Sequence, residues 1–203
     1  MKIICVGRNY AEHAAELKNE VPQEPVLFMK PDTSLILPKQ PFFYPDFSND
    51  VHYEAEVVVR INRLGKHIET RFAHRYYQEV ALGIDFTARD IQNRLKEKGL
   101  PWEKAKAFDG AALIGQWVDI SQLPPIHTLD FSLHLNGNCV QQGNTGCMLF
   151  SVDQLISYIS SFFTLKIGDL IFTGTPAGVG PVKKGDILEG FLNHMPNFYL
   201  PIR

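Results

Sequence analysis

The stretch VHYEAEVVVRI, residues 51–61, decides how the rest of the chain is interpreted. Its second half, VVVRI, is apolar and rich in β-branched residues, which favours a buried strand over a helix. Alternate residues of a strand face the same side, so we expect His52, Glu54 and Glu56 to share one face, with the two glutamates about 7 Å apart. Two like charges held so close on a half-buried surface repel each other. One of them must be protonated, or a positive group must lie between them.

Short strand-like segments dominate the remainder of the chain. We expect strands within residues 3–6, 26–31, 34–37, 80–88, 112–120, 129–135, 138–142, 170–176 and 185–192, and helices within residues 10–18, 70–79, 89–99 and 151–165. Asn136-Gly137 is a strong hairpin signal, and Ser151 is a good helix N-cap before an apolar stripe of helical period. Many short strands with few helices predict an α+β, mostly β fold, either a roll or a sandwich, and no linker divides residues 1–203 into separate domains.

Composition restricts the possible functions. The chain has 203 residues, 45% of them hydrophobic, which is enough for one full core. A net charge of −2 offers no basic field for nucleic acid or a membrane surface. No apolar run approaches the roughly 20 residues of a membrane span, and the chain opens in a strand-like segment without a charged leader. Three cysteines without metal-type spacing predict free thiols in a reducing cytoplasm. We therefore expect a cytoplasmic protein that binds neither nucleic acid nor membrane.

A third carboxylate joins the two glutamates as a candidate metal ligand. Asp85 interrupts the second face of the strand predicted over 80–88, where a lone acid needs a partner. With Glu54 and Glu56 it would give three oxygen ligands for a hard divalent cation, best Mg²⁺, with Mn²⁺ or Ca²⁺ as substitutes. In the alternative interpretation the glutamates lie on a solvated strand face and Asp85 caps the helix that begins at Arg89. His52 as a fourth ligand would instead make a softer, zinc-type site.

A second pair of residues suggests acid–base chemistry. His13 and Glu16 are three residues apart on a predicted helix and therefore share a face. A glutamate beside a histidine can fix the imidazole tautomer and raise its basicity, which would make the pair a general base. An exposed helical ion pair is the alternative, and spacing alone favours it.

Three further signals are weaker. Lys106 is a candidate cation facing an anionic substrate, although it is one of several lysines. Arg89 follows the Asp85 strand and could clamp a carboxylate with its guanidinium. The segment TGTPAGVG, residues 173–180, lacks the ending of a phosphate loop, but its backbone N–H groups and the Thr175 hydroxyl could hold a carboxylate. A plain tight turn between strands explains the same glycines.

Several of these pieces occur in the order found in one family. The elements E-x-E at 54–56, D-x-x-x-R-D at 85–90 and TGTP-x-GVG at 173–180 are specific as a set, and together with the flanking segments they cover nearly the whole chain. The sequence resembles the fumarylacetoacetate hydrolase family. It is similar to the short members that act as acylpyruvate hydrolases and oxaloacetate decarboxylases or tautomerases. The flanking segments that match are VGRNYAEHAAEL, EPVLFMKP, GLPWEKAKAFD, QQGNTGCMLFS, ISYISSFFTLKIGDL and KKGDILEG.

The resemblance implies a fold, a cofactor and roles for individual residues. The implied fold is the mixed β-sandwich roll of the fumarylacetoacetate hydrolase C-terminal domain, usually in a homodimer. By analogy with the family, three carboxylates hold Mg²⁺ or Mn²⁺, a His–Glu dyad on a lid within about residues 1–25 is catalytic, and the other named side chains face or surround the substrate. The residues at these positions are Glu54, Glu56 and Asp85 for the metal, His13, Glu16 and Lys106 for catalysis, and Arg89, Gln141, Thr175 and Lys30 for the substrate.

The resemblance also implies a reaction. The first expectation is a metal-dependent hydrolase that cleaves a carbon–carbon bond in a 2,4-dioxo acid, such as an acylpyruvate or a fumarylacetoacetate-like compound. It would release pyruvate or an acetoacetate-type product and a carboxylic acid. Decarboxylation or tautomerisation of oxaloacetate, and isomerisation of a 2-hydroxyhepta-2,4-diene-1,7-dioate-like compound, use the same chelate and remain alternatives. A non-catalytic β module that binds a ligand is the alternative from another class.

Overall fold

The computed structural model describes residues 1–16 and 20–203, and its largest element is a seven-stranded mixed sheet. The strand order is β2-β1-β11-β4-β5-β7, and β8 pairs with Glu79 and Val80 of β5. The pairing of β1 with β11 is parallel, and the other pairs are antiparallel. The strands are β1 (Ile3–Gly7), β2 (Val26–Lys30), β4 (Ala55–Ile61), β5 (Tyr77–Asp85), β7 (Ala112–Ile114), β8 (Val118–Asp119) and β11 (Leu170–Phe172).

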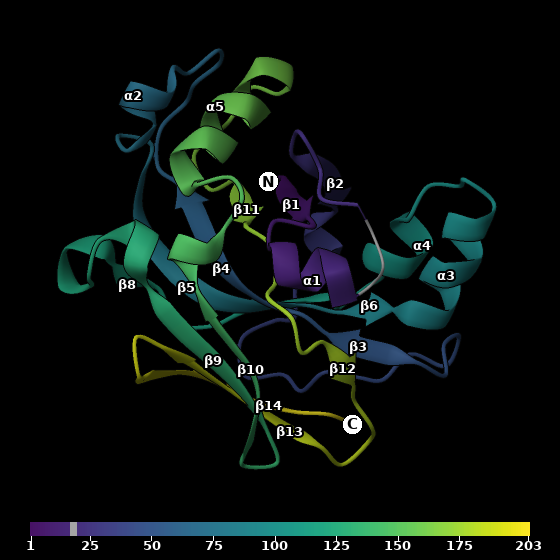
Figure 1. Cartoon of the computed structure of the whole chain (residues 1–203). Coiled ribbons are helices and arrows are strands. Elements are labelled where there is room, and N and C mark those ends of the chain that lie inside the picture. The colour runs from purple at the N-terminus through teal and green to yellow at the C-terminus, as the bar shows by residue number, and fades with distance from the viewer. Residues whose placement is uncertain (17–19) are drawn as a thin grey trace.

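Two smaller sheets complete the β structure of the described residues (Figure 1). An antiparallel four-stranded sheet has the order β10-β9-β13-β14, and a three-stranded sheet has the order β12-β3-β6. Their strands are β3 (Val51–Tyr53), β6 (Thr87–Ala88), β9 (Asp130–Leu135), β10 (Asn138–Asn144), β12 (Gly180–Pro181), β13 (Ile187–Leu192) and β14 (Met195–Pro201). The predicted mostly β fold with a few short helices is therefore confirmed.

The helices of the described residues are short and lie at the margins of the sheets. Helices α3 and α4 pack together beside β6, whereas α2 and α5 pack together at the opposite side of the molecule (Figure 1). The α-helices are α1 (Ala11–Glu16), α2 (Thr70–Ala73), α3 (Arg89–Glu97), α4 (Glu103–Lys106) and α5 (Val152–Phe162), and the 3-10 turns are Asp32–Ser34, Ile120–Gln122, Ile126–Thr128 and Thr145–Cys147. None of these helices is long and apolar enough to cross a membrane.

Local signals explain several element boundaries. Ser151 caps α5 and forms a capping box with Gln154, as its side chain accepts the Gln154 N–H and the Gln154 side chain accepts the Ser151 N–H. The hairpin between β9 and β10 turns at Asn136 and Gly137, whose φ angles of 52° and 82° are left-handed, as this turn type requires. Both predictions are confirmed.

Several expectations about individual elements are wrong. The strand expected over 80–88 divides at Phe86 into β5 and β6, which belong to different sheets, and the strand expected over 112–120 divides into β7 and β8. The strand expected over 170–176 ends at Phe172. The strand expected over 51–61 is broken at Glu54, because the chain passes there from the three-stranded sheet into the seven-stranded one. Residues 34–37 form only a bridge, from Leu35 to Ala112, after the turn Asp32–Ser34. The helix expected over 70–79 ends at Ala73, since β5 already begins at Tyr77 and pairs with β4. The helix expected over 10–18 is seen as Ala11–Glu16, and residues 17–19 lie outside the described residues.

The core fixes the two strands that carry the acidic residues. The apolar residues of β5 predicted to share a face, Val80, Leu82 and Ile84, belong with Phe86 to one buried cluster. Every residue of β4 except Arg60 is buried, as is usual for a strand at the centre of a covered sheet. Acidic side chains at the ends of β4 and β5 are therefore held on a rigid, dry support.

Candidate active site

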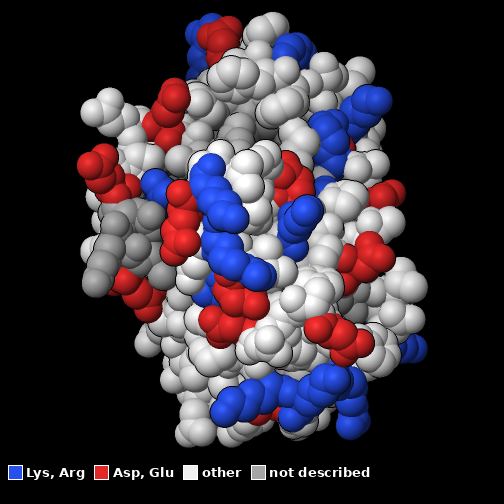
Figure 2. Space-filling view, turned by 90° about the vertical axis from the view of Figure 1, so that its right-hand side faces the viewer, with Lys and Arg blue, Asp and Glu red and all other residues white. Residues whose placement is uncertain are grey.

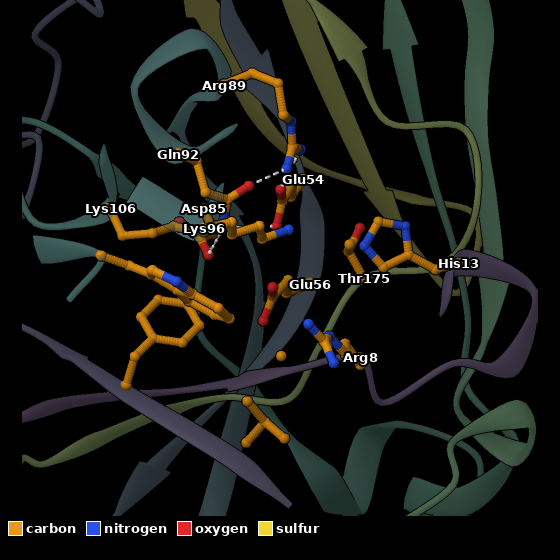
Figure 3. A pocket seen from close by; sticks show the side chains of 14 residues that line it. Arg8, His13, Glu54, Glu56, Asp85, Arg89, Gln92, Lys96, Lys106 and Thr175 are labelled. Carbon is orange, nitrogen blue, oxygen red and sulfur yellow. Dashed lines mark hydrogen bonds and ion pairs between the residues drawn. The ribbon is translucent and has the colours of Figure 1, made fainter. Parts of the chain in front are cut away.

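A pocket opens where the ends of β1, β4 and β5 meet α1, α3 and α4. Figure 3 shows that its charged side chains converge on the three acidic residues near its centre. Figure 2 views the molecule from the side that carries α3 and α4, where acidic and basic side chains are interspersed and basic ones gather near the middle. The lining residues are Val6, Gly7, Arg8, His13, Phe28, Glu54, Glu56, Asp85, Arg89, Gln92, Lys96, Trp102, Lys106 and Thr175.

The three predicted acidic residues come together in this pocket. Glu54 lies at the break between β3 and β4, Glu56 lies on β4, and Asp85 ends the neighbouring strand β5. One carboxylate oxygen from each lies within 4.8 Å of the others, and all three side chains are buried. The interpretation of a solvated strand face is thus wrong. Asp85 does not cap α3, because Lys106 and Lys30 hold its two oxygens.

Three basic side chains partner two of the carboxylates. The Lys106 ammonium lies 2.8 Å from Glu54 Oε2 and 2.7 Å from Asp85 Oδ2. Lys30 Nζ lies 2.7 Å from Asp85 Oδ1, and Arg89 Nη2 lies 2.5 Å from Glu54 Oε1. All of these side chains are buried, so the attraction between their charges is little screened by water.

The two glutamates respond oppositely to this environment. Burial alone would raise the pKa of Glu54, but Lys106 and Arg89 outweigh it and hold that pKa well below its usual range. Burial, together with the negative charges of Asp85 and Glu54, raises the pKa of Glu56 well above its usual range. The repulsion expected from the E-x-E pattern is therefore relieved in two ways. Glu54 is paired with cations, and Glu56 favours its protonated form as long as no further cation is present.

The acidic cluster has the properties of a site for a hard divalent cation. Its ligand atoms are carboxylate oxygens, which Mg²⁺, Mn²⁺ and Ca²⁺ prefer. Asp85 Oδ1 is buried and has no aligned hydrogen-bond donor among the described residues, although the Lys30 ammonium is near it. A divalent ion would supply the positive charge that Glu56 lacks. His52 lies outside this cluster and pairs through Nε2 with Asp50 at 2.9 Å, so the structure gives no support to a zinc-type site.

The His13–Glu16 pair borders the same pocket. His13 Nδ1 lies 3.2 Å from Glu16 Oε2, and His13 is only 5% exposed. Glu16 Oε1 accepts a hydrogen bond of 3.1 Å from the Gly178 N–H, which ties α1 to the loop after β11. The pair is thus more than a surface ion pair, because its imidazole lines the pocket and its carboxylate is anchored on a second segment.

The segment 173–180 contributes both to the pocket wall and to its support. The Gly174 N–H donates to Glu56 Oε2 at 2.7 Å, and Thr175 lines the pocket. Gln141 lies behind this wall rather than in it. Its Nε2 donates to Thr175 Oγ1 at 2.9 Å, and its Oε1 accepts the Ala55 N–H at 2.9 Å. Gln141 thereby positions Thr175 and the start of β4, and Lys30 likewise lies outside the lining, next to Asp85.

The structure also adds pocket residues that the sequence analysis did not identify. Gln92 and Lys96 follow Arg89 at helical spacings of three and seven residues and line the pocket with it. That periodicity within the predicted helix was a usable signal. Arg8 lines the opposite wall after β1 and carries no such signal.

A buried acidic centre, a His–Glu pair and a mostly β scaffold are together typical of enzymes that use a divalent cation. The model of the fumarylacetoacetate hydrolase C-terminal family matches residues 2–197. The chain belongs to the fumarylacetoacetate hydrolase family, as its motifs predict.

Similar proteins and structures come from several organisms. The chain is 43% identical over 187 residues to the mitochondrial oxaloacetate tautomerase of Mus musculus, covering 92% of this chain and 85% of that protein. It is 42% identical over 189 residues to the mitochondrial oxaloacetate decarboxylase of Dictyostelium discoideum, covering 93% and 87%. Among solved structures, fumarylpyruvate hydrolase from Pseudomonas aeruginosa in complex with Mn²⁺ and pyruvate superposes with a TM-score of 0.93 at 36% identity, covering 100% of this chain and 89% of that one.

Proposed function

We propose that this chain is a divalent-metal-dependent enzyme that interconverts the keto and enol forms of oxaloacetate or a closely related 2-oxo acid. The observation that carries the proposal is the buried group Glu54, Glu56 and Asp85, with oxygens within 4.8 Å of one another, in a pocket that His13 also lines. The similarity to an oxaloacetate tautomerase supports this choice of reaction over the carbon–carbon hydrolysis that the sequence analysis placed first.

The three acidic side chains would hold Mg²⁺, with Mn²⁺ or Ca²⁺ as substitutes. When bound, the ion would supply Lewis acidity to a 2-oxo acid in the pocket, which would make the carbon next to the oxo group more acidic. Lys30, Lys106 and Arg89 already pair with Glu54 and Asp85, and their three positive charges equal the charge of the three carboxylates once Glu56 is also ionised. A divalent ion therefore leaves the centre positive, and a substrate anion completes the balance.

His13 is the proposed acid–base group. With its Nδ1 proton shared with Glu16, its Nε2 is the ring nitrogen that is free to accept a proton. In the keto-to-enol direction Nε2 takes the proton from C3 of the oxo acid, the 2-oxo oxygen takes a proton from water to become the enol hydroxyl, and the imidazolium then releases its proton to water. In the reverse direction the enol hydroxyl gives its proton to water, and the imidazolium, protonated from water, gives a proton to C3. Glu16 stabilises the imidazolium in both directions.

The remaining predicted residues orient the substrate in this proposal. The Lys106 ammonium, fixed between two carboxylates, places positive charge where the enolate develops. Thr175 presents its hydroxyl to the pocket and binds the substrate carboxylate, while Gln141 holds Thr175 in place. Arg89 and Lys30 fix Glu54 and Asp85 respectively. We further propose that residues 1–203 form one catalytic domain and that two copies form a homodimer, which light scattering of the purified protein would test.

A substrate panel tests the proposed reaction. The ultraviolet absorbance of enol oxaloacetate should decay faster with the enzyme and Mg²⁺ or Mn²⁺ than with the enzyme and chelator. Pyruvate release should not keep pace with that decay, because tautomerisation conserves all carbon atoms. Metal-dependent pyruvate release at the same rate would instead identify a decarboxylase. Absence of any metal-dependent turnover would refute the proposal and favour a non-catalytic binding module.

Hydrolysis of an acylpyruvate is the second candidate. The His13–Glu16 pair favours it, since a paired imidazole can remove a proton from water. The hydroxide would add to the distal carbonyl, the carbon–carbon bond would break, and pyruvate enolate and a carboxylic acid would leave. Metal-dependent cleavage of acetylpyruvate that is faster than enol conversion of oxaloacetate would establish this reaction in place of the first.

A further inference from the structure

Lys96 is a pocket cation without an acidic partner among the residues that the structure describes. It lies on the face of α3 that also carries Arg89 and Gln92. Its ammonium is 5.5 Å from the centroid of the Trp102 ring, an arrangement that shields the charge without neutralising it. Among residues 1–16 and 20–203, no carboxylate forms an ion pair with it. Arg89, on the same helix, is by contrast already held by Glu54.

Arg8 is a second such cation, placed on the wall formed by the end of β1. It lines the pocket and has no ion pair or side-chain hydrogen bond within the described part of the chain. Its φ angle is 61°, in the left-handed region that non-glycine residues seldom adopt. Strain of this kind is concentrated at functional positions, because the surrounding structure must hold it in place.

These two cations act on each other across the pocket. Burial lowers the pKa of Lys96 to about 8, and the positive charges of Arg89, Arg8 and Lys106 add to this effect against the opposing charge of Glu54. Figure 3 shows Arg8 and Lys96 on different sides of the acidic centre, both directed into the pocket. Converging positive charges without a protein partner form a site for an anion. The pocket therefore combines an acidic centre with cations beside it that no carboxylate of the described residues neutralises.

We propose that Arg8 and Lys96 bind the distal carboxylate of a dicarboxylic oxo acid, and that they select such substrates over monocarboxylic ones. This inference rests on the proposed function, in which the acidic centre and its metal hold the carboxylate and 2-oxo group at the other end of the molecule. Arg8 offers a planar fork of donors and Lys96 a single ammonium, and both groups bind carboxylates. An acylpyruvate with an uncharged tail would leave both cations unpaired.

A matched pair of unreactive ligands isolates this interaction. Malate and 2-hydroxybutyrate share the hydroxy-carboxylate group that chelates a metal and differ at the far end, where one has a carboxylate and the other a methyl group. Their affinities for the Mg²⁺-loaded protein are measured by calorimetry. We expect malate to bind about tenfold more tightly or better, the size of an interaction with charged partners.

Variants then assign the preference to the two residues. Lys96→Gln and Arg8→Asn should each reduce the malate preference about tenfold and leave 2-hydroxybutyrate affinity unchanged. Asparagine suits the left-handed backbone at position 8, and Lys96→Arg should keep the preference because it keeps the charge. Lys104→Gln is the control, since Lys104 is an exposed lysine on the neighbouring helix α4.

The possible outcomes separate the two proposals. Equal affinities of the wild-type protein for malate and 2-hydroxybutyrate would overturn the inference. A preference retained in Lys96→Gln or in Arg8→Asn would overturn the shared site. Oxalate can chelate a metal ion without contacting Arg8 or Lys96. Metal-dependent oxalate binding together with either of these two results would therefore overturn the inference about Arg8 and Lys96 and leave the proposed function standing. Absence of metal-dependent oxalate binding would overturn both.

Discussion

Replacing Lys106 by methionine tests the charge balance of the pocket. Lys106 donates to Glu54 and Asp85 at 2.8 and 2.7 Å from a fully buried position. Methionine keeps most of the side-chain volume and removes the charge. Breaking a buried ion pair from one side costs about 3–5 kcal/mol. Glu54 keeps Arg89 and Asp85 keeps Lys30, so we expect the lower end of this range, about 3 kcal/mol.

The corresponding change in melting temperature is large enough to measure. For a chain of this size, 1 kcal/mol shifts Tm by about 2–4 °C, so the variant should melt about 6–12 °C below wild type in the presence of chelator. Added Mg²⁺ should recover part of the loss and should stabilise the variant more than the wild type, because the ion replaces the missing positive charge. Circular dichroism melts with chelator and with Mg²⁺ provide both values.

Lys104→Met is the matched control. Lys104 lies on the same short helix but is exposed, and its replacement should shift Tm by no more than about 2 °C. The reasoning fails if Lys106→Met melts within about 2 °C of wild type in chelator, or if Mg²⁺ stabilises it less than it stabilises wild type.

Four further predictions concern protons. The raised pKa of Glu56 means that metal must displace a proton; metal affinity should therefore fall as pH is lowered through that pKa, and calorimetry in buffers of different ionisation enthalpy should detect proton release. By the same linkage, the metal-free protein should lose stability as pH rises from about 4.5 through that pKa, because the folded state keeps a proton on Glu56 that the unfolded state releases. Denaturant titrations without metal should show this loss in wild type and not in Glu56→Gln. Lys96, with a pKa of about 8, should be charged below that pH, so kcat/KM for a dicarboxylic substrate should fall as pH rises through about 8. A bound metal ion should move this fall to a lower pH, because its positive charge lowers the pKa further. If Lys96→Gln shows the same fall in kcat/KM at high pH, Lys96 is not its cause. His13→Ala should lower metal-dependent enol conversion roughly 100-fold or more while leaving metal affinity intact, and normal turnover in that variant would rule out its role as the base.

The acidic centre could be predicted because strand alternation gives acidic residues few acceptable environments. Glu54 and Glu56 stand in an otherwise apolar, β-branched run, and Asp85 interrupts a second one. A carboxylate in such a run must be paired, solvated or bound to a cation, so the residues alone offered the cluster beside a solvated alternative, and the family resemblance favoured the cluster. The break at Glu54 was not predictable in the same way, because it depends on the chain crossing from one sheet to another.

The basic part of the pocket was less accessible to sequence analysis. Lysines and arginines occur throughout the surface, and their role depends on which carboxylates the fold brings near them. Lys106 was only a weak candidate among several lysines and Lys30 was named from the family resemblance alone, and the structure places both ammonium groups beside Asp85. Arg8 and Lys96 became visible only when segments 88 residues apart met in three dimensions.

The helix predicted over 70–79 failed for a related reason. Residues after Ala73 include Tyr76 and Tyr77, and aromatic residues favour strands when a partner strand is available. Tyr77 pairs with Ile61 of β4, so pairing with the central sheet overrides the local helical pattern. Contacts between distant segments of this kind carry no local signal.

The binding of Mn²⁺ to wild type and to Glu56→Gln tests the central claim most directly. Glu56 accepts only the Gly174 N–H among the described residues, and a glutamine oxygen can accept the same hydrogen bond, so this variant removes the negative charge without unpairing a lysine or arginine. We predict one Mn²⁺ ion per chain in wild type, and an affinity more than about 100-fold weaker in Glu56→Gln, whose metal-free Tm should be no lower than that of wild type. No binding by wild type, or equal binding by both proteins, would contradict the proposal of a metal centre at these carboxylates.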